Sequence, residues 1–428
     1  MTNKLESFTL APGFRAAAAA CGLKPSGNLD LALIAVEAPC SVAGVFTTNR
    51  VKAAPVLYDQ DLLAKNAGGI RAIIVNAGNA NACTGPRGID DARQMAALTA
   101  YGLRCQPDQV LVLSTGVIGR HLDMDKLTQG IATVTSAAAA QHGALVAARA
   151  IMTTDTRPKV ASASFKIDGQ PVTISGMCKG SGMIHPNMAT LLAIVTTDAL
   201  VVPELLQTAL RQAAYRSFNC VSVDGDMSTN DTLLLLASGA SGVEIVATED
   251  TEITEKRING DKSSESSVPS VAYQRFVAAL TDVCIDLAKQ VAGDGEGATR
   301  LIEIRVAGAQ DEAQAHTVGD SIARSPLFKC AVHGGDPNWG RVLCAAGYSG
   351  AAIDPDRLSL SFGVAGAAQV QVVADGLPVD YAEREAAALL REDPVYVNLD
   401  LGLGDAAATV WTCDFSKEYV EINAHYTT

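Results

Sequence analysis

The sequence predicts an α/β protein of two domains, on two observations. Strand-like apolar runs alternate with alanine-rich helical runs almost from end to end of the chain. The chain also has 428 residues, 48% of them hydrophobic, which exceeds one ordinary domain and suffices for a large core. A soft boundary falls near Gly293, so we expect an N-terminal domain over residues 1–293 and a C-terminal domain over residues 294–428.

The expected elements of the N-terminal domain begin with a strand over residues 29–47. Further apolar runs predict strands at 70–78 and 109–116, and the segment 91–103 between them has the apolar spacing of a helix. The alanine-rich segment 135–152 also predicts a helix.

A hairpin and a buried strand follow. Asp168 and Gly169 are a turn signal inside a predicted strand pair at 166–176. Leu191–Val195 is an unbroken apolar run, which is typical of a buried strand. The polar stretch 255–270 predicts a solvated surface loop.

The composition excludes several classes of partner. The formal net charge of −13 at pH 7 opposes nucleic-acid backbones and anionic membranes, and leaves small metabolites as the expected partners. No apolar run reaches the length of about 18 residues that predicts a transmembrane helix. The N-terminal segment has neither a signal-peptide core nor the composition of a transit peptide, so we expect a cytoplasmic protein.

The ten cysteines are scattered along the chain and form no C-x-x-C pair. Metal and redox motifs need close pairs, so we expect reduced, buried thiols. There are only six histidines, with no H-x-x-x-H pair among them. We therefore expect neither a metal site nor a cofactor.

The stretch KGSGMIHPNMAT at 179–190 joins a glycine-rich turn to the predicted buried strand and places Thr190 at the junction. A threonine hydroxyl is a poor nucleophile until a base takes its proton, and the residue's own α-amino group has a suitable pKa. That amine exists only if the Ala189–Thr190 bond is cut. Attack of Thr190 Oγ on the Ala189 carbonyl in a strained turn would cut it through an ester. The alternative is a plain loop-to-strand junction with a surface threonine.

The end of the strand at 109–116 is a second candidate. Ser114, Thr115 and Gly116 precede a turn of small residues, where backbone N–H groups beside a hydroxyl would form an oxyanion hole. Gly116 would allow a substrate to approach the backbone closely. An ordinary turn is the alternative.

The glycine-rich segment AGDGEGATR, at 292–300, is a third candidate. It follows a predicted helix at 273–295 and precedes a predicted strand at 301–308. Nucleotide-binding glycine loops have the opposite order, with the helix after the loop, so we do not expect a phosphate site here. Glu296 is instead suited to a cationic group such as a substrate ammonium. A solvated carboxylate is the alternative.

Two other stretches are unusually rich in Asx residues. They contain Asn76, Asn79 and Asn81 within 75–85, and Asp224, Asp226, Asn230 and Asp231 within 222–232. The second imitates a calcium loop but lacks the glutamate that closes one. Because Asx residues favour turns, we interpret both stretches as structural.

Together these segments resemble the ornithine acetyltransferases, or glutamate N-acetyltransferases, of arginine biosynthesis. The likeness covers nearly the whole chain, with the motifs in the same order. They are GVFTTNRVKAAPV (44–56), IIVNAGNANACTG, STGVIG, MTTDTRPK, KGSGMIHPNMAT, SFNCVSVDGDMSTNDT, AGDGEGATR, GGDPNWGR (334–341) and the terminal EINAHYTT.

The resemblance implies a two-domain, layered α/β sandwich with the active site between the domains and the C-terminal tail closing it. It implies self-cleavage at Ala189–Thr190 into fragments of 189 and 239 residues (428 − 189 = 239), assembled as two copies of each. Thr190 would take the acetyl group of N2-acetylornithine and pass it to glutamate in a ping-pong reaction without a cofactor. Some members also accept acetyl-CoA, and the sequence does not distinguish the two kinds.

The resemblance also assigns site residues. Thr115 and Gly116 match the oxyanion-hole positions of the family. Substrate contacts fall on Thr154, Lys179, Thr190, Glu296, Asn423 and Thr428. Lys179 suits the α-carboxylate of acetylornithine and Glu296 its side-chain ammonium, each by a charge-assisted hydrogen bond.

The main alternative function is a self-processing amidase or aminopeptidase with the same N-terminal threonine. The two enzymes share an acyl-enzyme and differ in whether water or an amine attacks it. The pair of Lys179 and Glu296 favours transfer, because it suits a short zwitterionic donor. A non-catalytic binding protein, in contrast, would stay in one piece.

Overall fold

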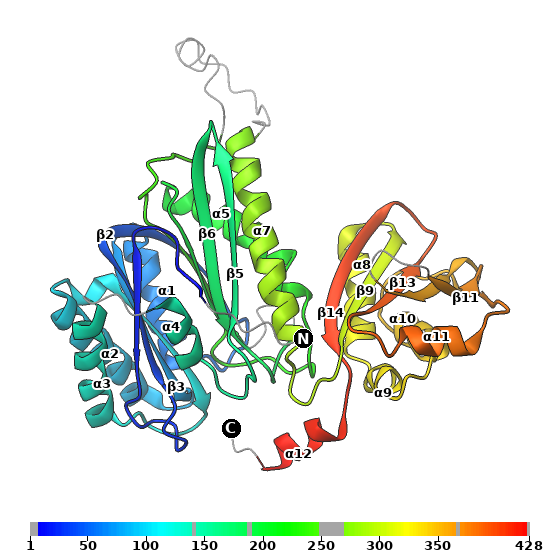
Figure 1. Ribbon diagram of the computed structural model, residues 1–428, viewed down its shortest axis with the longest axis horizontal. Helices are drawn as coiled ribbons and strands as arrows, with labels where there is room; N and C mark the ends of the chain where they lie inside the picture. The colour runs from blue at the N-terminus through cyan, green and yellow to red at the C-terminus, as the bar shows by residue number, and fades with distance from the viewer. Residues whose placement is uncertain (1–6, 139–142, 186–190, 248–268, 365–368, 426–428) are drawn as a thin grey trace, which may run out of the picture.

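The computed structural model describes residues 7–138, 143–185, 191–247, 269–364 and 369–425. Ala189, Thr190 and Thr428, and nearly all of the predicted loop at 255–270, lie outside these residues. The described chain forms two separate β-sheets with helices packed on them (Figure 1).

The first sheet has eight strands. Its strand order is β4-β3-β2-β8-β7-β6-β5, and β1 also pairs with β2. The strands are β1 (Phe14–Ala19), β2 (Leu31–Phe46), β3 (Ile70–Asn79), β4 (Val110–Val117), β5 (Lys159–Ile167), β6 (Gln170–Lys179), β7 (Leu192–Thr197) and β8 (Thr232–Ala237). Strand β2 is shared: its first part pairs with β1 and β3, and its last part with β8.

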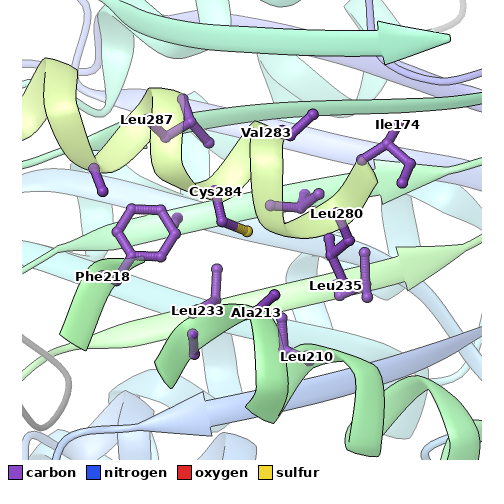
Figure 2. Close-up of a cluster of buried hydrophobic side chains, with 14 of the residues drawn as sticks. Ile174, Leu210, Ala213, Phe218, Leu233, Leu235, Leu280, Val283, Cys284 and Leu287 are labelled. Atoms are coloured by element: carbon purple, nitrogen blue, oxygen red, sulfur yellow. The ribbon is translucent and has the colours of Figure 1, made fainter. Parts of the chain in front are cut away.

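Alternate residues of these strands enter cores on opposite faces of the sheet, as the two-residue period requires. On β8, Leu234 joins the core that also contains helix α4, whereas Leu233 and Leu235 join the core under α5 and α7. Figure 2 shows this second core, in which side chains of α7 and α5 meet those of the strands. On the other part of the sheet, α2 and α3 cover the corresponding face.

The helices of this part are interspersed with its strands along the chain. They are α1 (Ala54–Asn66), α2 (Gly85–Leu103), α3 (Met124–Ala137), α4 (Ala144–Ala150), α5 (Pro203–Tyr215) and α7 (Val271–Ala292). Layers of helices on a buried sheet confirm the predicted layered α/β class.

A six-stranded sheet follows α7, in the order β12-β11-β10-β13-β9-β14. Its strands are β9 (Leu301–Ala309), β10 (Ser359–Gly363), β11 (Val370–Ala374), β12 (Leu377–Pro378), β13 (Val395–Asp400) and β14 (Ala406–Cys413). Its core is shared with α8 (Glu312–Ala323), α9 (Pro326–Gly334), α10 (Trp339–Gly347) and α11 (Glu383–Leu389). The last helix, α12 (Lys417–His425), leaves this sheet and lies apart from it (Figure 1).

Most elements lie where the sequence predicts them, and the exceptions have local causes. Asp168 and Gly169 both have positive φ, 50° and 81°, as the predicted hairpin turn between β5 and β6 requires. The helix predicted over 135–152 is wrong as a single element: α3 ends at Ala137 and α4 starts at Ala144, preceded by Gly143 in an extended conformation. Glycine is a poor helix former, so a new helix begins after it.

The ten cysteines are all free thiols. The expectation that they are buried is wrong for Cys83, Cys330 and Cys344, which are exposed. Among the described residues, no helix has the length and apolar character needed to cross a bilayer. The boundary expected near Gly293 stays a prediction; it falls between α7 and β9.

Candidate functional site

A cavity of about 130 Å³ lies where the ends of β4 and β6, the turn after α7 and helix α12 meet. It brings together the predicted residues that the structure describes: Thr115, Gly116, Thr154, Lys179, Glu296 and Asn423. Its other lining residues are Ala80, Ile118, Thr153, Gly182, Met183, Asp224, Asp226, Ser228, Thr229, Asn230 and Tyr419. A larger hollow of about 500 Å³, on the six-stranded sheet, is lined by none of the predicted residues.

Lys179 places an ammonium group in this cavity. It is the last residue of β6, pairs with Leu192 of β7, and is only 4% exposed. Burial lowers the pKa of Lys179, and the nearby Asp155 carboxylate acts against that shift. Among the described residues its Nζ makes no hydrogen bond or ion pair. A buried ammonium is stable only with a partner, so this position suits the carboxylate of a ligand.

Glu296 lies in the turn between α7 and β9, which confirms the helix-loop-strand order. Its backbone N–H donates to the Ser181 carbonyl at 2.9 Å, and the residue is only 8% exposed, so the alternative of a solvated carboxylate is wrong. Gly182 lies against it: a Cβ at that position would come within 2.4 Å of Glu296 Cδ. The glycine therefore leaves the space that the carboxylate occupies.

The C-terminal helix reaches the same carboxylate. Asn423 Nδ2, on α12, donates to Glu296 Oε2 at 2.8 Å, across 127 residues of sequence. Tyr419 on the same helix also lines the cavity. The predicted return of the tail to the pocket is thus present as far as Asn423.

Thr115 and Gly116 directly precede Val117, the last residue of β4, and pair with Ala77 and Gly78 of β3. Gly116 has φ +129°, and a Cβ on it would come within 2.3 Å of the Gly78 carbonyl carbon. The sequence predicts that this glycine allows a substrate to approach the backbone. In the structure the backbone of β3 lies so close to Gly116 that no larger residue fits there.

Substitution of Gly116 by alanine is therefore expected to destabilise the protein strongly. Gly119 is a matched control, since it has φ +80° and nothing within 4 Å of an added Cβ. Gly119→Ala should lower the free energy of unfolding by about 1–2 kcal/mol, the cost of a left-handed backbone at a residue with a Cβ. Gly116→Ala should lower it by about 2 kcal/mol or more beyond that, because its Cβ would collide with backbone atoms. Chemical denaturation measures both, and equal losses would contradict the collision.

Asn230 and Asp231, which we interpret from the sequence as structural, hold these segments together. Asn230 Nδ2 donates to the carbonyls of Ala80 at 2.7 Å and Ser114 at 2.8 Å, which fixes the end of β4. Asp231 is fully buried and accepts the Leu191 N–H at 3.1 Å, directly after the predicted cleavage site. The available signal for Asp231 was an acidic residue directly before a strand that contains four consecutive leucines, Leu233–Leu236.

Asp224 is the remaining carboxylate of note on the cavity wall. It accepts the N–H groups of Met183 at 2.5 Å and Ile184 at 2.9 Å. Burial raises the pKa of Asp224 to about 6, although these N–H groups lower it. Within the described part of the chain, no group of three or more His, Cys, Asp or Glu could hold a metal ion.

The cavity thus has a lysine side chain at one place and a carboxylate at another, in a volume suited to a small molecule. Such a site can bind a short zwitterion by its two charged ends. The predicted nucleophile, Thr190, lies outside the described residues, and Leu191 after it is buried.

Comparison with known proteins finds close relatives. The model of the ArgJ family matches residues 15–428. The arginine biosynthesis bifunctional protein ArgJ of Symbiobacterium thermophilum is 46% identical over 422 residues, 98% of this chain and 98% of that protein. The ArgJ protein of Synechocystis is 45% identical over 431 residues, 99% of this chain and 98% of that protein.

A solved structure is also similar in sequence. It is described as ornithine acetyltransferase complexed with ornithine, from Mycobacterium tuberculosis. It is 44% identical, covers 42% of this chain and 94% of that chain, and has a TM-score of 0.36.

Proposed function

The chain belongs to the ArgJ family, and we propose that the cavity around Lys179 and Glu296 is the active site of its acetyl transfer. The protein is an acyltransferase of arginine biosynthesis that moves the acetyl group of N2-acetylornithine to glutamate. The observation that carries the site is the buried Lys179 ammonium, without a partner among the described residues, in one cavity with the Glu296 carboxylate.

The reaction we propose has two steps. The Thr190 hydroxyl attacks the acetyl carbonyl of acetylornithine, its proton passes to the Thr190 amine, and ornithine leaves as the amide C–N bond breaks and its nitrogen takes a proton. The glutamate amine then attacks the acetyl ester, the C–O bond to Thr190 breaks, and the hydroxyl regains its proton. Thr115 and Gly116 are the proposed oxyanion-hole residues, and Thr154, Asn423 and Thr428 complete the substrate contacts.

Cleavage before Thr190 would leave the two fragments interlocked. Strands β7 and β8 belong to the second fragment, yet they lie between β2 and β6 of the first in one sheet. The fragments can separate only by breaking the β2–β8 and β6–β7 pairings. We propose that they stay together and assemble as two copies of each; native mass spectrometry tests this.

Two further parts of the proposal concern donor and location. Acetyl-CoA is proposed as a second donor, in keeping with the description of the relatives as bifunctional. A cytoplasmic location is proposed because ten free thiols suit a reducing compartment.

Intact-mass spectrometry of the purified protein, briefly mixed with acetylornithine, tests the function. The expected result is two fragments of 189 and 239 residues (428 − 189 = 239), the second partly heavier by one acetyl group. Addition of glutamate should remove that group as acetylglutamate. Acetate as the main product, with or without glutamate, would support the amidase alternative. Acetyl-CoA in place of acetylornithine tests the second donor.

Substitution of Glu296 by glutamine should separate the two half-reactions. Acetylornithine has a side-chain ammonium and glutamate does not, so the KM of the donor should rise about tenfold or more, and that of glutamate should change less. Glu421→Gln, an exposed change on α12, is the control and should leave both constants near their original values. Equal losses in both half-reactions would contradict the assignment of Glu296 to the ammonium.

A further inference from the structure

A buried network of charges lies directly behind the cavity. Lys159, the first residue of β5, donates from Nζ to Asp155 Oδ1 at 2.6 Å and also to Asp294 Oδ2. The side chains of Lys159 and Asp155 are 0% exposed and that of Asp294 is 5% exposed. Burial by itself would lower the pKa of Lys159, but the two carboxylates raise it above its usual value.

The network ties together the segments that line the cavity. Asp155 accepts the N–H groups of Thr153 at 2.9 Å and Gly180 at 2.7 Å. Asp294 accepts the N–H and hydroxyl of Thr156 through its side chain. Its backbone carbonyl accepts the Ser181 hydroxyl at 2.6 Å. The positions of Thr154, Lys179 and Glu296 are therefore set by one set of buried contacts.

Asp155 also acts on Lys179 without bonding to it. Both of its oxygens are occupied, one by Thr153 and the other by Gly180 and Lys159. Burial by itself would raise the pKa of Asp155, but Lys159 and Lys179 hold it well below its usual range, so it is ionised. Its negative charge raises the pKa of Lys179 against the effect of burial.

The other charged groups near Lys179 are few. Lys159 lowers the pKa of Lys179, whereas Asp231 and Glu296 raise it less than Asp155 does. Lys24, in the segment before β2, is near enough for the charge of Lys179 to contribute to the lowering of its pKa, of which burial is the largest cause. Burial raises the pKa of Asp231 itself well above its usual range. Asp155 is the carboxylate that raises the pKa of Lys179 most.

We propose that Asp155, Lys159 and Asp294 form a positioning network that keeps Lys179 charged and unpaired for the carboxylate of the substrate. Asp155 supplies the compensating charge, and Lys159 and Asp294 keep Asp155 from forming an ion pair with Lys179. The inference rests on the proposed function, since Lys179 is there the carboxylate-binding group.

The test is the pH dependence of the KM for acetylornithine in the cleaved enzyme. Lys179 must be protonated to bind a carboxylate, so the KM rises as the pH passes its pKa. Asp155→Asn removes a negative charge, lowers the pKa of Lys179, and should move the rise in KM to lower pH. Lys159→Gln removes a positive charge and should move it to higher pH. Its KM at low pH should also increase, because the freed Asp155 competes with the substrate.

Matched variants complete the design. Lys159→Arg keeps the charge and should retain the original pH profile. Ser181→Ala breaks one tie of the network without a change in charge, and should raise the KM without a shift in pH. If Asp155→Asn does not fold, Lys159→Gln and Lys159→Arg decide the question; if Lys159→Gln does not fold, Asp155→Asn and Ser181→Ala do.

The outcomes separate the inference from the function. Shifts in opposite directions for Asp155→Asn and Lys159→Gln support the network. An equal increase in the KM at every pH, or pH profiles that shift in the same direction in the two variants, would overturn the inference. The network would then only support the structure. Absence of acetyl transfer in the unmodified enzyme would instead refute the proposed function.

Discussion

Replacement of Thr190 by alanine is expected to leave one uncut chain of 428 residues that transfers no measurable acetyl group. The Thr190 hydroxyl is the proposed nucleophile of both the cleavage and the acetyl transfer, so its loss should prevent both. Without cleavage, residue 190 also has no free α-amine to act as base. Removal of a catalytic nucleophile lowers kcat by about 10³-fold or more. Intact-mass spectrometry measures the cleavage, and the release of ornithine from acetylornithine measures the transfer.

Thr190→Ser is the matched variant for this experiment. It keeps a hydroxyl and, once cleaved, an α-amine, so it should still yield two fragments and an acetyl-enzyme, more slowly because serine lacks the rotamer restriction of a β-branched residue. Two fragments from Thr190→Ala with a break before residue 190 would show that another group performs the cleavage. The nucleophile would then have to be sought elsewhere.

Replacement of Lys159 by methionine should have the largest effect on stability. The Lys159 ammonium lies between Asp155 and Asp294. Its removal leaves these two buried carboxylates without their common partner. Loss of one partner from a buried ion network costs about 3–5 kcal/mol. The free energy of unfolding from urea denaturation, with the m value compared between proteins, measures it.

Lys65→Met is the control for that measurement. Lys65 Nζ is also 2.6 Å from a carboxylate, Asp61 Oδ2, but both side chains are more than two thirds exposed (68% and 69%). Water screens this pair, so its loss should leave the midpoint of unfolding almost unchanged. Similar losses in the two variants would mean that burial does not govern these ion pairs.

The elements of the fold could largely be predicted from local patterns. The two-residue and helical periods of apolar residues locate β3, β4, β7 and α7 within a few residues of their observed limits. The turn at Asp168 and Gly169 follows from the backbone freedom of those residue types. The single helix over 135–152 was wrong, because an alanine-rich composition outweighed Gly143 in the prediction.

Several features of the site could not be predicted from local patterns. The candidate residues came from motifs, and the motifs do not show that Lys159 and Asp294, 135 positions apart, share an ion pair. Nor do they show that Asn423 on α12 donates to Glu296. Asp231, interpreted as a turn residue, proved to be a fully buried acceptor for Leu191.

The sequence by itself determined the strand and helix periods, the family, and the residue types that its chemistry needs. The tertiary structure alone decided which strands are neighbours, so that β7 and β8 lie between β2 and β6, and which charges lose their water. The physical reason is the separation along the chain of the residues that interact. Period and turn chemistry depend on adjacent residues, whereas the state of Lys179 depends on burial and on carboxylates that only packing brings near.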